Sequence, residues 1–312
     1  MLKVEKKYLK SCFNYTGGKH KLLQQIIQLF PTNIHTFVDL FCGGANVAIN
    51  VETKGKIYCI DKQEEVIRFF NTLQKYSIEE IFRTIKEIIE TFGLSNTFQY
   101  GYEYYGCESS TGLSHYNKDK YKALRDFYNN NKKQNENHSY FDLIFYVLTV
   151  YGFNNQIRFN KKGDYNIPVG KRDFNEKIQN NLYQFIQVIQ KKDFIFQCKD
   201  FRDMDIHLTE GDFLYADPPY LISTATYNEQ NGWTINDEKD LLELLDSLDR
   251  KSVKFALSNV IEHKGKENTI LKEWINKHKH YRVHYLDYNY NHSNYQFKHK
   301  KSKTLEVLIT NY

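Results

Sequence analysis

The stretch HTFVDLFCGGANVAINV, residues 35–51, decides the fold of this chain. It begins with a mostly apolar run of strand length, passes through Gly43 and Gly44, and ends in a helix-like pattern over residues 46–51. Strand, glycine turn and helix in this order are typical of the start of a nucleotide-binding α/β unit. A glycine turn alone is weak evidence, because ordinary turns use glycine too.

A second strand is predicted over residues 56–60, and it ends in Asp61. This acid follows the glycines by about twenty residues, the spacing at which a nucleotide-binding unit places the acid that binds the ribose. Strands and helices alternate again later in the chain, which predicts a mostly parallel sheet that closes with an antiparallel pair. We expect strands at residues 194–198, 213–216, 254–258, 282–286 and 304–310, and helices at residues 236–250 and 268–277.

The alternation is interrupted once, in the middle of the chain. Over residues 71–173 the pattern changes to helical stretches such as 78–91 and 141–151, with polar, aromatic-rich connections. We therefore expect one α/β domain built from residues 1–70 and 174–312, with residues 71–173 forming an inserted, mainly helical domain.

Composition limits the kind of protein. A chain of 312 residues can bury a sizeable core, and no apolar run reaches the roughly 18 residues of a membrane span, so we expect a cytoplasmic protein without a membrane partner. The formal net charge of +5 permits a polyanionic partner without requiring one. Five scattered cysteines, none at C-x-x-C spacing, predict a reducing compartment and no structural metal site: Cys12, Cys42, Cys59, Cys107 and Cys198.

The segment Asp217-Pro218-Pro219-Tyr220 directly follows the apolar strand at residues 213–216. The two prolines fix φ and remove two backbone donors, so the turn is rigid and its carbonyls can accept hydrogen bonds. A carboxylate, a carbonyl and an aromatic ring at one strand end suit an amino group on a planar heterocycle, such as a nucleobase. An ordinary turn is the alternative for this motif taken alone.

The motifs, taken in order, resemble those of the Dam-type adenine-specific DNA methyltransferases, in which cofactor motifs precede a target-recognition insert and Asp-Pro-Pro-Tyr follows it. Residues 14–19, 39–44 and 200–201 are similar to the cofactor motifs, and residues 306–312 to the closing strand. The resemblance implies a Rossmann-like sheet that binds S-adenosylmethionine without a metal, next to an inserted target-recognition domain. It assigns the cofactor to Tyr15, Gly17, Gly18, Lys19, Asp39, Phe41, Gly43, Gly44, Asp61, Asp200, Phe201 and Asp217.

The resemblance also implies the reaction, which is transfer of a methyl group to the N6 amino group of adenine with S-adenosylhomocysteine as product. Asp217 and the Pro218 carbonyl would accept the two N–H groups, Pro219 would hold the turn, and Tyr220 would stack on the base. Transfer to the amino group of cytosine is a second hypothesis, because the same acceptors suit that amine. A catalytically silent DNA-binding regulator of the same fold is a third.

DNA contacts are expected in the insert, because a base paired in a duplex must be flipped out to be methylated. By resemblance, Phe153 would wedge into the gap, Asn154 would meet the orphaned base, and Arg158 is suited to read a guanine edge. Phe153 taken alone would more often be an aromatic ring buried in the core. The nearby basic residues 161, 162, 171 and 172 would suit either contact with DNA phosphates or a solvated surface. The residues assigned to DNA are Asn14, Phe153, Asn154, Arg158, Asn160, Asn166, Pro168 and Lys171.

Three positions depart from the family's usual pattern. Ala45 replaces a glycine, which requires negative φ there; Asn14 replaces a base-reading lysine of the enzymes that recognise GATC; and residues 155–156 replace a small apolar pair. The recognition sequence therefore stays open. So do the role of the basic segment 297–303 and the biological setting, whether a bacterial or a phage enzyme, alone or with a restriction endonuclease. A monomer suffices for methylating one base at a time.

Overall fold

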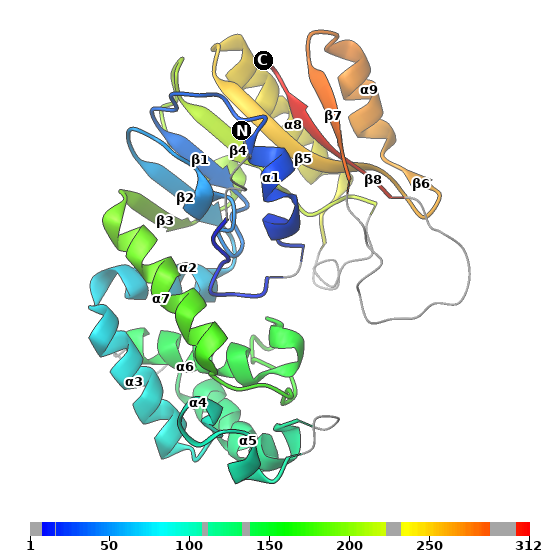
Figure 1. Ribbon diagram of the computed structural model, residues 1–312. Coiled ribbons are helices and arrows are strands. Elements are labelled where there is room, and N and C mark those ends of the chain that lie inside the picture. The colour runs from blue at the N-terminus through cyan, green and yellow to red at the C-terminus, as the bar shows by residue number, and fades with distance from the viewer. Residues whose placement is uncertain (1–7, 16, 108–111, 133–137, 223–231, 288–303) are drawn as a thin grey trace, which may run out of the picture. The chain divides into compact units, whose positions relative to one another are not determined.

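The computed structural model describes residues 8–15, 17–107, 112–132, 138–222, 232–287 and 304–312. The chain forms two compact units (Figure 1). We call the first the sheet unit, made of residues 1–8, 19–62 and 193–312, and the second the helical unit, made of residues 9–18 and 63–192. The helical unit thus extends beyond residues 71–173 on both sides.

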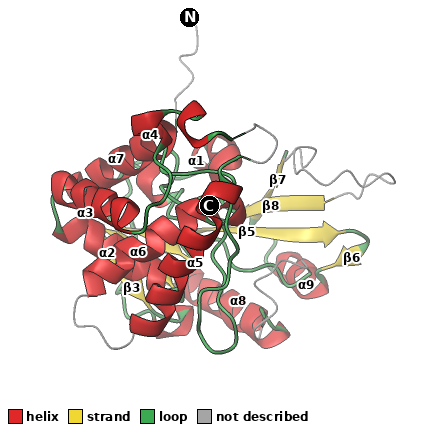
Figure 2. Ribbon diagram, turned by 90° about the horizontal axis from the view of Figure 1, so that it is seen from below, coloured by secondary structure: helices red, strands yellow, loops and turns green. Residues whose placement is uncertain are grey.

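The sheet unit contains one eight-stranded sheet, and the predicted parallel sheet with an antiparallel end is confirmed. Seven strands follow the order β3-β2-β1-β4-β5-β8-β7, and β6 pairs with β5. The first five are parallel, whereas β8 runs antiparallel to both of its neighbours. Figure 2 shows the opposite directions of β5 and β8. The strands are β1 (Phe37–Leu40), β2 (Ile57–Asp61), β3 (Phe194–Cys198), β4 (Phe213–Ala216), β5 (Lys254–His263), β6 (Lys266–Glu267), β7 (Arg282–Leu286) and β8 (Thr304–Thr310).

Alternate residues of the strands face opposite sides of this sheet, as the strand period of two requires. Val38 and Leu214 lie in one buried cluster with the apolar faces of α8 (Ile235–Arg250) and α9 (Thr269–Lys277). Phe37 and Phe213 instead pack against Phe30, on the side that carries α1 (Leu23–Ile27) (Figure 1). Both faces are covered, so the central strands are buried throughout, as expected for a parallel sheet.

The glycine turn after β1 does not lead into the helix predicted at residues 46–51, and this part of the prediction is wrong. Only a 3-10 turn, η2 (Ala48–Asn50), forms there. The required negative φ at Ala45 is also absent, because this residue has φ = 56°. A left-handed residue that is not glycine costs roughly 1–2 kcal/mol, and the buried Ala45 amide donates to the Cys42 carbonyl at 2.7 Å, which holds this turn.

The helical unit is built around α6 (His138–Tyr151), which is buried from Phe141 to Tyr151. Phe13 packs on Phe69, Phe145 and Tyr146, so the segment 9–18 completes this core. The other helices are α2 (Glu64–Lys75), α3 (Ile78–Thr91), α4 (Thr97–Tyr100), α5 (Ser114–Asn131) and α7 (Glu176–Lys191), with short 3-10 turns η3 (Glu103–Tyr105) and η4 (Phe153–Asn155).

Candidate active site

The candidate catalytic turn lies where the strand order reverses. β1 lies between β2 and β4. From β1 the sheet continues through β2 and β3 on one side and through β4 and β5 on the other. Open α/β sheets bind ligands outside the carboxyl ends of their strands at such a point. Asp217 follows β4 directly, and its backbone N–H donates to the Leu40 carbonyl at the end of β1, at 3.2 Å. The motif is therefore fixed at the edge of the sheet where a ligand is expected.

Asp217 is held by two donors. Lys19, in the 3-10 turn η1 (Lys19–Leu22), places its Nζ 2.8 Å from Asp217 Oδ2. The Tyr220 hydroxyl lies 3.1 Å from Asp217 Oδ1. Lys19 Nζ also lies 5.1 Å from the centre of the Tyr220 ring. Of the other motif residues, Pro218 is buried and Pro219 half-buried.

A second carboxylate, Glu306 in β8, completes this group of side chains. Its Oε1 lies 3.1 Å from the Tyr220 hydroxyl and 3.6 Å from Lys19 Nζ. We call Lys19, Asp217, Tyr220 and Glu306 the buried cluster. No role is predicted for Glu306 from the sequence, although an acid among the apolar residues of a strand is a usable signal, because unpaired buried carboxylates are rare.

Burial and charge act in opposite directions in this cluster. Burial raises the pKa of Asp217, and Glu306 adds to the rise, while Lys19 opposes it. For Lys19, burial favours the neutral amine, but Asp217 and Glu306 outweigh this effect and raise the Lys19 pKa. Lys19 is therefore a cation fixed between two carboxylates, with only 6% of its side chain exposed.

Two predicted cofactor acids bind the glycine turn itself. Asp61 Oδ2 accepts the Gly43 N–H at 2.8 Å, and Asp39 Oδ2 accepts the Ala48 N–H at 3.1 Å. Asp39 is buried, and this burial raises its pKa well above the usual range. Gly43 has φ = 48°, a conformation that suits glycine. Both acids thus fix the shape of the loop that follows β1.

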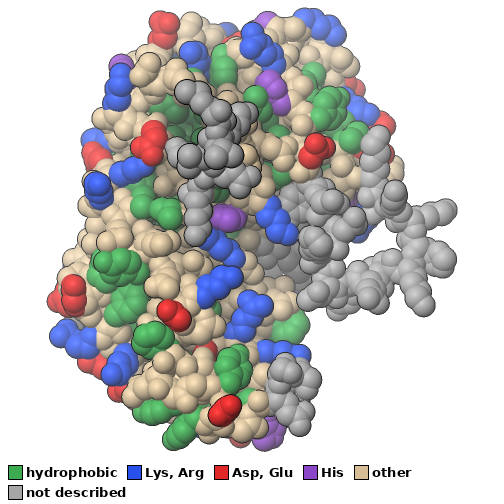
Figure 3. Space-filling view, in the orientation of Figure 1, with side chains coloured by type: hydrophobic (Ala, Val, Ile, Leu, Met, Phe, Trp, Pro, Cys, Tyr) green, Lys and Arg blue, Asp and Glu red, His purple; other side chains and the backbone are tan. Residues whose placement is uncertain are grey.

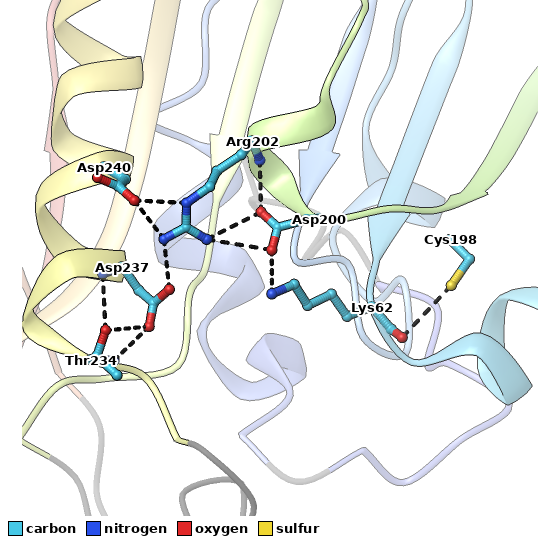
Figure 4. Close-up of polar contacts among 7 residues, drawn as sticks. All are labelled: Lys62, Cys198, Asp200, Arg202, Thr234, Asp237 and Asp240. Atoms are coloured by element: carbon cyan, nitrogen blue, oxygen red, sulfur yellow. Dashed lines mark hydrogen bonds and ion pairs between the residues drawn. The ribbon is translucent and has the colours of Figure 1, made fainter.

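A more exposed group of charges follows β3 (Figure 4). Arg202, in η5 (Phe201–Asp203), is its centre: it pairs with Asp200 at 3.3 Å, with Asp237 at 2.7 Å and with Asp240 at 2.6 Å. Lys62, after β2, forms an ion pair with the other oxygen of Asp200. We call these five residues the exposed cluster. It ties Asp200 to the first turn of α8.

Aromatic rings lie next to the exposed cluster. The Arg202 guanidinium lies 4.4 Å from the centre of the Phe201 ring. Phe201 and Phe41 pack on each other at 5.4 Å and on Trp233 at 5.6 and 5.4 Å. Trp233 was not assigned to the site; its ring nitrogen donates to the buried Glu238 at 2.6 Å, which fixes it beside the two predicted cofactor residues.

In the helical unit, most of the predicted DNA-contacting residues lie on one segment, residues 152–170. Backbone bridges join Gly152 to Val169 and Phe159 to Tyr165, so the segment folds back on itself. Phe153 has 46% of its surface exposed, which contradicts the core alternative for this ring. Asn154 is exposed as well, with φ = 55°, a conformation that asparagine tolerates.

Arg158 is exposed, and its Nε donates to Asn166 Oδ1 at 2.8 Å. Asn160 is less available, because its side-chain oxygen accepts the N–H groups of Lys162 and Asp164 and closes a local turn. Pro168 and Lys171 are exposed on the same segment or just after it.

The remaining assigned residues lie before Lys19. Asn14, Gly17 and Gly18 are exposed and Tyr15 is half-buried, and the Gly18 N–H donates to the Tyr15 carbonyl at 3.1 Å. The basic segment 297–303 lies outside the described residues. Lys and Arg side chains are spread over the visible face with acids among them (Figure 3). Within the described ranges, no helix has both the length and the apolar character needed to cross a membrane.

Comparison with known proteins shows which family the chain belongs to. The family model for D12 class N6 adenine-specific DNA methyltransferases matches residues 15–292. Type II methyltransferase M.FokI of Planomicrobium okeanokoites is 40% identical over 312 residues, and modification methylase StsI of Streptococcus sanguinis is 41% identical over 314 residues. Each alignment covers 98% of this chain but 43% of the relative, so the chain spans less than half the length of these two proteins.

A more distant relative matches over most of both lengths. The DNA adenine methylase of Escherichia coli strain K12 is 23% identical over 282 residues, which cover 88% of this chain and 86% of that protein. The family model spans the glycine turn, the insert and the Asp217 turn together. The chain belongs to the D12 class of N6 adenine-specific DNA methyltransferases.

Proposed function

We propose that this protein transfers a methyl group from S-adenosylmethionine to the N6 amino group of adenine in a short duplex DNA sequence. The observation that carries the proposal is the Asp217 carboxylate, fixed at the carboxyl end of β4 beside Leu40 in a chain of this family. Asp217 and the Pro218 carbonyl would accept the two N–H groups of the amine. Tyr220 would stack on the base.

The chemistry needs this arrangement because the adenine amine is a poor nucleophile whose lone pair is delocalised into the ring. Two acceptors favour a more pyramidal nitrogen and stabilise the positive charge that develops on it. The bound S-adenosylmethionine supplies a methyl group on positively charged sulfur. We assign its ribose to Asp61 and its adenine to Asp200 and Phe201. We also assign the turn at Gly43 and Gly44 to the binding of this cofactor.

Target recognition is assigned to the helical unit, and in particular to residues 71–173. Flipping a base out of a duplex costs a few kcal/mol, which protein contacts must offset. The exposed Phe153 and Asn154 are chemically suited to fill the gap, and Arg158 to contact a guanine. Exposed lysines such as Lys171 would contact phosphates, which makes binding salt-dependent.

The names of two relatives suggest the biological setting. One is a type II methyltransferase and the other a modification methylase. We propose a bacterial or phage-encoded enzyme that acts as a monomer in the bacterial cytoplasm and protects DNA from a partner restriction endonuclease.

The test is to incubate the purified protein with labelled S-adenosylmethionine and unmethylated genomic DNA, and to map modified bases by single-molecule sequencing. Methyladenine in one short motif, absent with Asp217→Ala, is the expected result. Methylcytosine would instead establish the cytosine reaction. Binding of both cofactor and DNA without transfer would identify a silent regulator and overturn the proposal.

A further inference from the structure

We infer that Glu306 is a positioning residue of the active site, whose negative charge serves as the counter-ion of Lys19 and leaves the charge of Asp217 available to the reacting amine. This inference rests on the proposed function. It concerns a residue that touches neither substrate nor cofactor in the proposed reaction and acts through Lys19 and Tyr220.

The first step of the argument is the charge count of the buried cluster. Lys19 Nζ lies 2.8 Å from Asp217 and 3.6 Å from Glu306. Among the four side chains of the buried cluster, one cation faces two carboxylates, which leaves one net negative charge on these four. If Glu306 were neutral, Lys19 and Asp217 would cancel, and the four side chains would carry no net charge.

The second step is the charge that the reaction creates. Methyl transfer forms the bond from N6 to the methyl carbon and breaks the bond from that carbon to sulfur, whose electron pair stays on sulfur. The positive charge of the sulfonium therefore passes to N6, until N6 loses a proton to the Asp217 carboxylate. A lysine at 2.8 Å from that carboxylate opposes this charge unless another anion balances it.

The third step is the sharing of donors. Both donors that occupy Asp217, the Lys19 ammonium and the Tyr220 hydroxyl, are also within reach of Glu306 Oε1. The single proton of a hydroxyl can be donated to one carboxylate at a time. When the adenine amine approaches Asp217, Glu306 can accept Tyr220 and attract Lys19, so that neither donor is left unsatisfied.

The fold explains why Glu306 holds this place. β8 lies between β5 and β7, and Glu306 pairs with Val260 and Leu286. Its neighbours Leu305 and Val307 belong to the cluster on the α8 face, so Glu306 points to the opposite face of the sheet. Only 4% of its side chain is exposed, so solvent screens its charge weakly.

The test uses three variants of the full chain. Glu306→Gln keeps the shape and removes the charge, and Glu306→Asp restores the charge. Glu238→Gln is the matched control, because Glu238 is also buried, also accepts several hydrogen bonds, and lies in the same unit. Thermal unfolding should show comparable losses for the two glutamine variants.

The first readout does not need turnover. In the cofactor-free protein, carboxylate signals are followed by ¹³C NMR against pH and assigned with Asp217→Asn. Among the described residues, the other charged or titratable groups near Asp217 are Lys19, Tyr220, Asp39 and Tyr215. Since the Glu306 charge raises the pKa of Asp217, Glu306→Gln should lower that pKa, whereas Glu238→Gln should leave it in place. A Glu306 that is protonated at neutral pH would overturn the inference.

The second readout is methyl transfer to unmethylated genomic DNA under single-turnover conditions. We expect Glu306→Gln to slow transfer roughly 10-fold or more, but by less than the roughly 10²- to 10³-fold lost with a direct transition-state contact, because Glu306 acts through Lys19. Glu306→Asp should recover most of the rate. The dissociation constant for S-adenosylmethionine should stay within about twofold, since Glu306 balances charge at the catalytic turn. An unchanged rate, or a parallel loss of cofactor affinity, would contradict the inference; an inactive wild-type protein would instead contradict the proposed function.

Discussion

Asp217 and Asp200 are two acids that follow the carboxyl ends of β4 and β3, two strands of one sheet with β1 and β2 between them, and each acid is paired with a lysine. The acids are similarly accessible, with 18% and 21% of their side chains exposed. Their lysines differ: 6% of Lys19 is exposed and 64% of Lys62. The two lysine–aspartate pairs therefore carry the same charges in different surroundings.

The difference decides what each lysine can do. An exposed ammonium is hydrated and screened by salt, so its ion pair is worth about 0–1 kcal/mol and can be exchanged for a ligand. A buried ammonium has lost its water, and removing one partner of such a pair typically costs about 3–5 kcal/mol. We conclude that Lys62 is a replaceable partner of Asp200, while Lys19 is a fixed part of the charge at Asp217.

The largest effect is expected from the two acids themselves. Asp217→Ala should reduce methyl transfer by roughly 10³-fold or more, because it removes the group that receives charge in the transition state. Its DNA affinity should be largely retained, and its cofactor affinity should fall less than that of Asp200→Ala. Asp200→Ala should instead weaken cofactor binding, with the rate recovered at saturating S-adenosylmethionine.

Titration calorimetry and single-turnover rates separate these outcomes. If Asp217→Ala lost cofactor affinity as strongly as Asp200→Ala, the two acids would share one function and the contrast between them would be wrong.

The next effect concerns the buried lysine. Lys19→Met removes the positive charge that opposes the rise in the Asp217 pKa, so this pKa should increase further. Asp217 must be ionised to accept the amine, and activity is lost as pH falls through its pKa. In a plot of the methyl-transfer rate against pH, the acidic limb should therefore move to higher pH, by about one pH unit or more.

The control is Lys62→Met, which should leave that limb where it is. The opposite shift expected for Glu306→Gln provides an internal check on the sign. A limb that stays in place in Lys19→Met would show that Lys19 does not set the charge of Asp217.

The sequence predicts the parts of the molecule that depend on adjacent residues, and it misses those that depend on contacts between distant residues. The strands were found because their apolar runs are local signals, and the Asp217 turn because its four residues are adjacent. Glu306 was missed because it meets Tyr220 across 86 residues of chain, through a strand order that no local pattern reveals. The predicted helix after Gly44 failed for a related reason, since Ala45 and Asp39 hold a left-handed turn by contacts that periodicity does not register.

A smaller effect is expected at Arg202, the centre of the exposed cluster. Arg202→Met leaves Asp237, Asp240 and Asp200 without their shared cation, so Asp200 should be less well positioned. We expect cofactor binding to weaken by roughly threefold to tenfold, with a normal rate at saturation. Arg202→Lys keeps the charge but not the planar fork, and should recover only part of the affinity. A loss of rate that saturating cofactor does not restore would place Arg202 in the catalytic step instead.

The smallest effect is expected at Lys62, and its sign is informative. Because Lys62 occupies an oxygen of Asp200, it competes with any adenine amine that binds there. Lys62→Ala should therefore tighten S-adenosylmethionine binding slightly, by no more than about threefold at low salt, which is the scale of an exposed ion pair. Raising the salt to about 0.5 M should remove this difference, because it screens an exposed pair, while the Lys19→Met effect on the pH profile persists. Weaker binding in Lys62→Ala at every salt concentration would mean that Lys62 contacts the cofactor directly, and the exposed lysine would then be as much a part of its site as the buried one.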